Sequence, residues 1–447
     1  MKKKVIIIGG GFAGLTAAAE LCSSGYQVTI VEQRGFLGGR AYSFIDKHGN
    51  IELDNGQHIL MGCYENTFRF LKTIGALDNL YIQESLSVDF LDKNGDVYSL
   101  DCPDIPAPLH IASGILGFSA LSLPDRFRML KVSKDLLLNK TDRTLEDSSI
   151  TEWLNRLGQG KESRDNFWGI LSYAVMNEGP DSASAYLFKN VLRKAFFSSR
   201  KGSRIVLPAL PLSRMYVDSA EDYINKHGGI IKKTALVSGL IIKNDNVSGI
   251  RLRDGEIIKG DFYISAVPYF ALKRIIPEDI MISHYEYFGV TEKLKPSPII
   301  SIHMLFDRTI TDCIFFALIN SPVQWVFNKG LIYRDKAPAG LLSLVISGAH
   351  NYISWSSKDI LDMSMKEIEG IFPGADSARL LYSKVIKERA ATFSPQPGVE
   401  RFRPSRETPI RNLFLAGDWT DTGIPATIEG AVISGYKTAE LIKKEPF

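Results

Sequence analysis

The 447-residue sequence has few cysteines and histidines, and it has no strong charge of either sign. Its four cysteines, Cys22, Cys63, Cys102 and Cys313, are far apart, so there is no CxxC pair and no metal-ligand spacing. We therefore expect reduced thiols in a cytoplasmic protein, and no bound metal. The 53 basic and 50 acidic residues nearly balance. With no basic tract, this balance argues against a nucleic-acid partner.

The first 33 residues allow two interpretations. Three lysines, an apolar run and several alanines are also found in secretory signal peptides. The same residues fit a buried strand at 5–8, a G-x-G-x-x-G turn at 9–14, a helix, and a second strand at 28–31. The second strand ends in an acid, Glu32, at nearly the spacing of a ribose-binding carboxylate. A signal peptide predicts neither the second strand nor the acid, so the sequence favours a dinucleotide site.

Each position of this turn has a physical reason. Gly9 permits a tight turn, Gly11 lets the backbone approach a pyrophosphate, and Gly14 lets the helix pack closely on the strand. The first N–H groups of the helix then face the phosphates. The predicted cofactor contacts here are Gly9, Gly11, Phe12, Ala13, Gly14, Glu32 and Gln33.

Two further segments favour FAD over NAD. A second glycine turn, Gly38-Gly39-Arg40, offers close backbone approach and a cation for a pyrophosphate, although a surface loop would look similar. Near the C-terminus, a buried strand at 412–419 ends in Gly417 and Asp418, and a helix is predicted at 431–443. The N-terminus of that helix suits the anionic part of a reduced flavin.

The middle of the chain supplies a third piece of the same pattern. Residues 211–229 predict a helix, followed by strands at 230–233, 237–242, 247–253 and 261–268 with Asx and glycine turns between them. This order returns the chain to a buried strand.

The start, middle and end together resemble the FAD-dependent amine oxidase and carotenoid desaturase superfamily. The resemblance implies an α/β fold with a Rossmann-type FAD-binding domain and a discontinuous α+β substrate domain. The first would comprise 1–60, 205–270 and 405–447, and the second 61–204 and 271–404. By the same resemblance, Val237 would lie by the adenine and Asp418 by the ribitol or pyrophosphate, and the turn under the isoalloxazine would contain Thr427, Ile428 and Ala431.

Three stretches, 53–64, 205–213 and 417–432, resemble the hydroxysqualene dehydroxylase branch. This implies a C30 isoprenoid lipid as substrate and places Gly56, Gln57 and His58 near the flavin. Plant-type phytoene and ζ-carotene desaturases share parts of these stretches and are the nearest alternative. Amine oxidation is less favoured, because Thr427 occupies the place of a cage tyrosine and residues 297–306 contain no lysine.

Replacing an allylic C–OH by C–H needs a proton for the leaving hydroxide and a hydride from reduced FAD. We expect Asp54 and His58 to be the catalytic candidates, while a turn at Asn55-Gly56 and a core histidine remain the alternative. Glu429 is expected to hold the turn under the flavin. The electron donor that reduces FAD again is not identified by the sequence.

Residues 105–134 combine an uncharged stretch with a basic amphipathic segment. Prolines and polar residues make the stretch a poor membrane span. The pattern predicts peripheral contact with an anionic membrane, at the inner face of the cytoplasmic membrane. Two core helices with a solvated face would show the same pattern.

Overall fold

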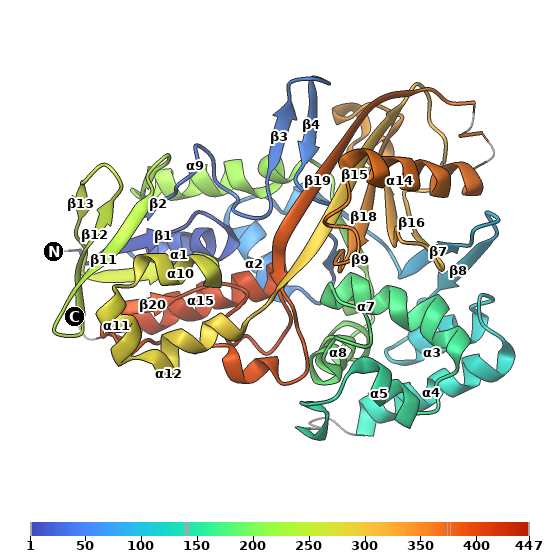
Figure 1. Ribbon diagram of the computed structural model, residues 1–447, viewed down its shortest axis with the longest axis horizontal. Helices are drawn as coiled ribbons and strands as arrows, with labels where there is room; N and C mark the ends of the chain where they lie inside the picture. The colour runs from blue at the N-terminus through green and yellow to red at the C-terminus, as the bar shows by residue number, and fades with distance from the viewer. Residues whose placement is uncertain (1, 139–142, 373, 376, 446–447) are drawn as a thin grey trace.

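The structure is a computed structural model that describes residues 2–138, 143–372, 374–375 and 377–445 (Figure 1). Its first layer is a five-stranded parallel sheet in the order β10-β2-β1-β14-β20. The strands are β1 (Lys4–Ile8), β2 (Gln27–Val31), β10 (Ile230–Lys232), β14 (Phe262–Ser265) and β20 (Leu413–Leu415). A continuous apolar run such as that of β1 suits a strand buried on both faces, and Val5–Ile8 are all buried.

Helices from both ends of the chain lie together beside this sheet. They are α1 (Phe12–Ser23) and α15 (Ile428–Lys444), with α2 (Glu65–Thr73) and α9 (Asp218–Lys226) nearby. A Cβ added to Gly435 would lie 2.5 Å from the Ala13 carbonyl oxygen. Likewise, a Cβ at Gly14 would lie 2.1 Å from the Gly9 oxygen, so α1 packs closely on the turn after β1 as expected.

A second, mixed sheet has the order β19-β15-β18-β17-β16-β7-β8. Its strands are β7 (Ser87–Leu91), β8 (Val97–Asp101), β15 (Pro296–Phe306), β16 (Phe315–Leu318), β17 (Trp325–Asn328), β18 (Leu341–Ser347) and β19 (Leu380–Phe393). Helix α14 (Ser357–Ile371) packs on one face, through a core that includes Ile302, Leu344 and Ile368.

A helical region lies beside the second sheet, at the lower right of Figure 1. It contains α3 (Leu109–Gly117), α4 (Leu123–Leu138), α5 (Ile150–Arg156), α6 (Lys161–Ser163), α7 (Gly169–Met176) and α8 (Ala185–Leu192). Four short helices complete the set: α10 (Tyr269–Ile275), α11 (Glu278–Ser283), α12 (Tyr285–Phe288) and α13 (Lys329–Tyr333).

The structure also contains three small sheets. The hairpin β3 (Ser43–Asp46) and β4 (Ile51–Asp54) reaches toward the second sheet. Strand β9 (Ile205–Pro208) pairs with β5 (Leu60–Met61) and β6 (Leu80–Ile82). The third comprises β11 (Val237–Lys243), β12 (Asn246–Leu252) and β13 (Ile257–Ile258).

The expected fold class is confirmed, with a parallel sheet assembled from the start, middle and end of the chain. The C-terminal helix begins at Ile428, three residues before the predicted start, because the Thr427 hydroxyl caps it by accepting from the Gly430 N–H at 3.0 Å. The predicted 211–229 helix is present as a π-type turn, Ser213–Val217, followed by α9. The domain boundaries stay a prediction.

Candidate functional site

The two glycine turns after β1 and β2 touch each other. Gly9 has φ +107° and Gly38 has φ +111°, and the Gly38 N–H donates to the Gly10 carbonyl at 2.8 Å. A Cβ on Gly39 would lie 3.0 Å from the Gly11 Cα. No side chain caps the N-terminus of α1, whose N-cap residue is Gly11. This leaves backbone N–H groups available for phosphate oxygens, as the sequence predicts.

The residues that follow Gly11 support the turn by packing in the core. Phe12 and Ala13 are buried, and the Phe12 ring stacks on Tyr216 with 3.8 Å between centroids. The Tyr216 hydroxyl donates to the carbonyls of Gly38 and Ala41 at 3.0 and 2.8 Å. Tyr216 therefore fixes both glycine turns at once, a role that the sequence did not indicate.

Glu32 is buried at the end of β2 and has more partners than the sequence predicted. Its carboxylate accepts from the N–H of Gly10 at 2.8 Å and of Arg34 at 2.9 Å. Each carboxylate oxygen has a second lone pair, so a ribose hydroxyl can still bind there. Gln33 is exposed. Val237 is buried, and the nearby Ala235 N–H donates to the Glu32 carbonyl at 2.8 Å.

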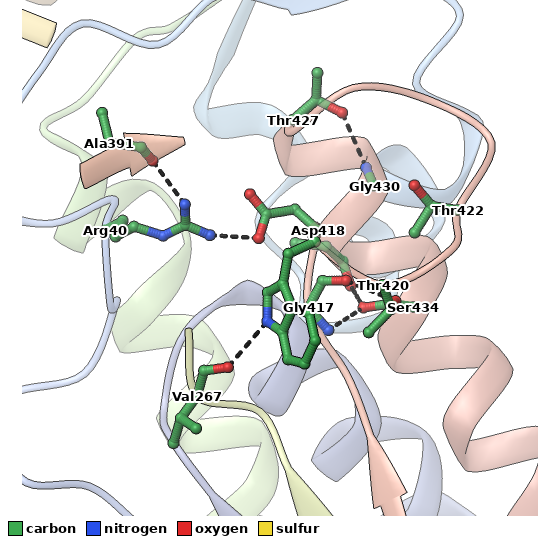
Figure 2. Close-up of polar contacts among 12 residues, drawn as sticks. Arg40, Val267, Ala391, Gly417, Asp418, Thr420, Thr422, Thr427, Gly430 and Ser434 are labelled. Carbon is green, nitrogen blue, oxygen red and sulfur yellow. Dashed lines mark hydrogen bonds and ion pairs between the residues drawn. The ribbon is translucent and has the colours of Figure 1, made fainter. Parts of the chain in front are cut away.

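Arg40 and Asp418 form an ion pair across 378 residues of sequence (Figure 2). Arg40 also donates to the Ala391 carbonyl on β19 at 2.6 Å. Asp418 is buried, whereas about a third of the Arg40 side chain is exposed (34%). The pair joins the second glycine turn, the C-terminal strand end and the second sheet at one point.

The loop after β20 is held by a residue that the sequence did not single out. The buried Arg403 guanidinium donates to the carbonyls of Asp418 (2.9 Å), Thr420 (2.6 Å) and Ile424 (2.8 Å). In Figure 2 the Gly417 N–H points to the Ser434 hydroxyl on α15, at 2.8 Å. Arg403 lies in a polar segment without periodicity, so no pattern could have shown this contact.

The first turn of α15 carries the residues predicted to lie under the flavin ring. Thr427 caps the helix, and Ile428 and Ala431 pack against the core around α1. The Glu429 carboxylate is fully buried and accepts from the N–H of Thr67 at 2.9 Å, and from its hydroxyl at 2.8 Å. Lys194 donates to it at 3.2 Å. Glu429 therefore caps the start of α2 and ties α15 to it. Its expected role in holding the turn under the flavin stays a prediction.

Asp54 ends β4 inside a closed polar cluster. One of its oxygens accepts from the Ser43 hydroxyl at 2.8 Å and the Leu212 N–H at 2.9 Å. The other accepts from Lys329 at 2.8 Å and from the Tyr333 hydroxyl. Although burial acts to raise the pKa of Asp54, the Lys329 charge and these hydrogen bonds lower it overall. The arrangement favours Asp54 as a permanent acceptor over Asp54 as a proton donor.

The segment after Asp54 contains the remaining candidates. Burial lowers the pKa of His58 to about 4, against the opposing effect of the Asp54 charge. Gln57 donates to the His58 carbonyl at 3.0 Å, while its own side-chain oxygen is buried without a partner. A Cβ at Gly56 would lie 3.3 Å from the Ser301 hydroxyl on β15. This segment thus lies against the second sheet.

Two ionisable residues of this cluster, Lys329 and Tyr333, were missed by sequence reasoning. Both come from α13, which begins directly after the buried strand β17. The Lys329 ammonium is 2% exposed and lies 275 residues from Asp54 in sequence. The available sequence signal was a lysine directly after an apolar strand. Lysines at the protein surface show the same pattern, so it did not mark Lys329 as buried.

These residues fit an FAD. The uncapped α1 helix and the two touching glycine turns offer backbone donors where a pyrophosphate needs them. Arg40 supplies a partly exposed cation, and the unpartnered Gln57 oxygen is an acceptor for a further polar group. Among the described residues, no group of three or more His, Cys, Asp or Glu side chains is arranged to hold a metal ion.

Comparisons with known proteins agree with this geometry. The profile of the family described as flavin containing amine oxidoreductase matches residues 12–443. A 15-cis-phytoene desaturase from Synechococcus elongatus is 30% identical over 98% of this chain and 95% of its own length. A zeta-carotene desaturase from Capsicum annuum is 26% identical over 99% of this chain and 81% of its own.

Solved structures show the same fold at low identity. An oxidoreductase from Methanosarcina mazei superposes with a TM-score of 0.77 at 20% identity, covering 98% of this chain and 100% of the other. A triple mutant of putrescine oxidase gives 0.76 at 16% identity, covering 100% and 99%.

Proposed function

The chain belongs to the flavin containing amine oxidoreductase family, and from this premise we propose that it reductively removes the hydroxyl group of hydroxysqualene to give squalene. It is an FAD-dependent oxidoreductase, and the FAD, when bound, supplies the hydride. The proposal concerns the substrate and the direction of the reaction.

The observation that carries the proposal is the meeting of the three stretches that resemble hydroxysqualene dehydroxylases. Strand β5, in 53–64, pairs with β9, in 205–213, with Leu60 opposite Val206. The Asp54 carboxylate accepts from the Leu212 N–H at 2.9 Å. The third stretch, 417–432, contributes Asp418 to Arg40 and Glu429 to the start of α2. The first two stretches are thus in direct contact, and the third reaches Arg40 and the start of α2, which directly follows residue 64. This arrangement supports the proposal.

In this proposal each part of the chain has a defined task. Gly11, Gly39 and the start of α1 bind the pyrophosphate, Glu32 orients the ribose, and Arg40 and Asp418 hold the cofactor's middle. Hydroxide leaves poorly, so a proton must reach the leaving oxygen. Both Asp54 oxygens are occupied by protein donors, so Asp54 orients the surrounding groups. His58, whose pKa is lowered to about 4, is neutral near pH 7 and can relay a proton from water to the leaving oxygen.

The proton assignment is tested by single-turnover oxidation of the reduced flavin by substrate. We expect His58→Gln to slow the step by about 100-fold, in the range of general acid catalysis. Asp54→Asn should act through loss of folding stability or cofactor content. Unchanged rates in both variants would remove both residues from the mechanism.

The reaction itself is tested by photoreducing the FAD-loaded protein without oxygen and adding hydroxysqualene. We expect reoxidation of the flavin with one squalene formed per flavin, measured by absorbance and by gas chromatography–mass spectrometry. Squalene added instead of hydroxysqualene is the control and should leave the flavin reduced. A flavin that stays reduced with hydroxysqualene intact would overturn the proposal. Squalene formation leaves FAD oxidised, so turnover needs an external two-electron donor.

Carotenoid desaturation is the second candidate, because the curated relatives named above are phytoene and zeta-carotene desaturases. In that reaction hydride flows the other way, from the hydrocarbon to oxidised FAD. Incubating the oxidised protein with phytoene would then bleach the flavin and extend the polyene absorbance. The same experiment without phytoene is the control.

We further propose that α3 and α4 contact the anionic inner face of the cytoplasmic membrane. Several large apolar side chains on these helices are exposed: Leu109 (61%), Leu123 (63%), Phe127 (61%) and Leu138 (68%). The basic residues Lys131 and Lys134 lie on α4 as well. In the part of the chain that the structure describes, no helix is long and apolar enough to cross a bilayer. Apolar side chains beside lysines suit insertion at the depth of the headgroups.

Sedimentation with phosphatidylglycerol vesicles tests this contact. We expect the protein to sediment with the vesicles at low salt and Phe127→Glu to reduce the bound fraction severalfold. Ile282→Glu is the matched control, because Ile282 is 70% exposed on α11, outside the proposed surface. Equal binding of both variants would contradict the assignment of the surface.

A further inference from the structure

One face of the second sheet carries a group of polar side chains in an apolar setting. In the register of β15, β18 and β17, His303 lies opposite Ser343, and Ser343 lies opposite Phe327. The next row contains Ser301, Val345 and Trp325. Side chains two residues apart on a strand share a face, so both rows point the same way. The other face packs on α14.

Three polar atoms on this face lack a partner. His303 Nδ1, Ser343 Oγ and Trp325 Nε1 are buried and form no hydrogen bond with any described residue. His303 and Ser343 are fully buried, and Trp325 is 7% exposed. His303 and Ser343 are directly opposed on neighbouring strands, which places their Cβ atoms about 5 Å apart, and Trp325 is diagonal to Ser343 at about 7–8 Å, within reach of a long side chain. A buried polar group without a partner costs free energy, so three together call for a ligand or ordered water.

The contacts of the His303 ring fix what the site offers. Its Nε2 lies 3.0 Å from the Asp54 carbonyl oxygen, which can only accept, so Nε2 carries the proton. Burial lowers the pKa of His303 to about 4, which keeps the ring neutral near pH 7. Nδ1 is then a bare acceptor. Beside it, Ser343 Oγ can donate or accept, and the Trp325 indole N–H can only donate.

The surroundings of these atoms are apolar and aromatic. The rings of Phe315, Trp325 and Phe327 lie 6.1 to 6.4 Å apart between centroids. The segment that contains Gly56 and Gln57 approaches the same face at Ser301. On this face the aromatic rings therefore adjoin the polar atoms, and the segment predicted to lie near the flavin approaches at Ser301.

We propose that His303 and Ser343, with Trp325 beside them, bind the hydroxyl group of an otherwise nonpolar alcohol substrate. The hydroxyl donates its proton to His303 Nδ1, and its oxygen accepts from Ser343 Oγ or Trp325 Nε1. One hydroxyl is the smallest group that both donates and accepts, so it satisfies the unlike atoms of this site. This inference rests on the proposed function and deepens it, because a purely hydrocarbon substrate has no group that can pair with any of the three atoms.

The inference is tested by binding rather than turnover. Oxidised, FAD-loaded protein in detergent is titrated with hydroxysqualene and, separately, with squalene, and the dissociation constants are read from the flavin absorbance. We expect wild type to bind the alcohol at least about 10-fold more tightly than the hydrocarbon, since an unmade hydrogen bond at a buried polar site is costly. Ser343→Ala and His303→Gln should each reduce this preference severalfold. Glutamine keeps a donor for the Asp54 carbonyl, while its acceptor oxygen does not stand at the position of Nδ1 on the ring.

A matched control comes from the far side of the sheet. Ser364 is also fully buried, but its hydroxyl donates to the Ile360 carbonyl within α14. Ser364→Ala should therefore keep the wild-type preference. Trp325→Phe keeps an aromatic ring at this position and removes the indole N–H.

The outcomes separate this inference from the proposed function. If wild type prefers the alcohol but forms no squalene, the hydroxyl site stands and the dehydroxylase proposal fails. If squalene forms while Ser343→Ala and His303→Gln retain the full preference, the hydroxyl site is overturned. Equal affinity of wild type for alcohol and hydrocarbon also overturns it, and would leave ordered water as the partner of these atoms.

Discussion

Two ion pairs, Lys329–Asp54 and Arg40–Asp418, each join parts of the chain that are more than 250 residues apart, yet they differ in their access to solvent. In the Lys329–Asp54 pair, the side chains are 2% and 1% exposed. In the Arg40–Asp418 pair, the arginine is 34% exposed. We call Lys329–Asp54 the closed pair, because both carboxylate oxygens of Asp54 accept hydrogen bonds from protein donors. We call Arg40–Asp418 the open pair, because its cation is accessible to a ligand.

The difference separates two uses of charge. A closed pair adds little stability compared with apolar side chains in its place. Removal of one partner, however, lowers the folding stability strongly, because an unpaired charge remains buried. A half-open pair contributes little to folding, because solvent screens it. Its remaining hydrogen-bonding capacity can serve an anion. The closed pair should thus govern stability, and the open pair should govern cofactor affinity.

The largest effect is expected from Lys329→Met. This change leaves the Asp54 carboxylate buried without its cation and should lower the free energy of unfolding by about 3–5 kcal/mol. Urea unfolding followed by circular dichroism measures it. Lys358→Met is the control, because that lysine pairs with Asp362 at the surface, where solvent screens the charges and the loss should be far smaller. Similar losses in the two variants would break the comparison.

The second prediction concerns pH and the histidine that supports the closed pair. Buried His303 stays neutral down to its pKa of about 4, while the unfolded chain takes up a proton below pH ~6.5. Because the folded pKa is the lower one, stability is full above pH ~6.5 and falls as the pH decreases toward 4, by up to about 3 kcal/mol.

This decline should be shallower in His303→Gln, measured by urea unfolding at several pH values between 7 and 4. His48→Gln is the control, at a ring that is 90% exposed, and should follow the wild-type slope. A decline of the same slope in His303→Gln would mean that other groups cause it.

The smallest effect on folding stability is expected from Arg40→Met. The same change should specifically weaken the binding of FAD. Loss of a charge-assisted hydrogen bond should weaken FAD binding by about 10-fold or more, while the free energy of unfolding without FAD should change by less than about 1 kcal/mol. Flavin fluorescence gives the dissociation constant. Arg69→Met, at an exposed pair with Glu20, is the control. Unchanged FAD affinity would contradict the role assigned to the open pair.

The parts of the fold that the sequence predicted are those whose signals are local. The strand, glycine turn and helix at the N-terminus, and Glu32 after them, follow from periodicity and from the conformations that only glycine adopts readily. The strands that complete the parallel sheet were also found, because each is a short apolar run between turns. The start of α15 was misplaced by three residues, because the cap formed by Thr427 was overlooked.

The closed pair could not be predicted, because its members come from distant segments. His303 and Lys329 reach Asp54 only after β15 and β17 have formed the second sheet, and neither strand carries a pattern that marks those positions. The contacts of Arg403 could not be predicted either, because its partners are backbone carbonyls, which have no sequence signature. Sequence reasoning therefore found the glycine turns and strand ends better than the buried polar groups beside the second sheet.

The parallel sheet has a consequence for how the molecule forms. Strand β1 pairs with β14, and β14 pairs with β20, so the sheet joins residues from both ends of the chain. During synthesis, β1, α1 and β2 leave the ribosome long before β14 and β20 exist. Until then the backbone edge of β1 is unpaired, and the apolar side chains of these elements stay exposed. Contacts so distant in sequence form slowly. The parallel sheet, and with it the site predicted for FAD, thus cannot be completed until β20 has been synthesised.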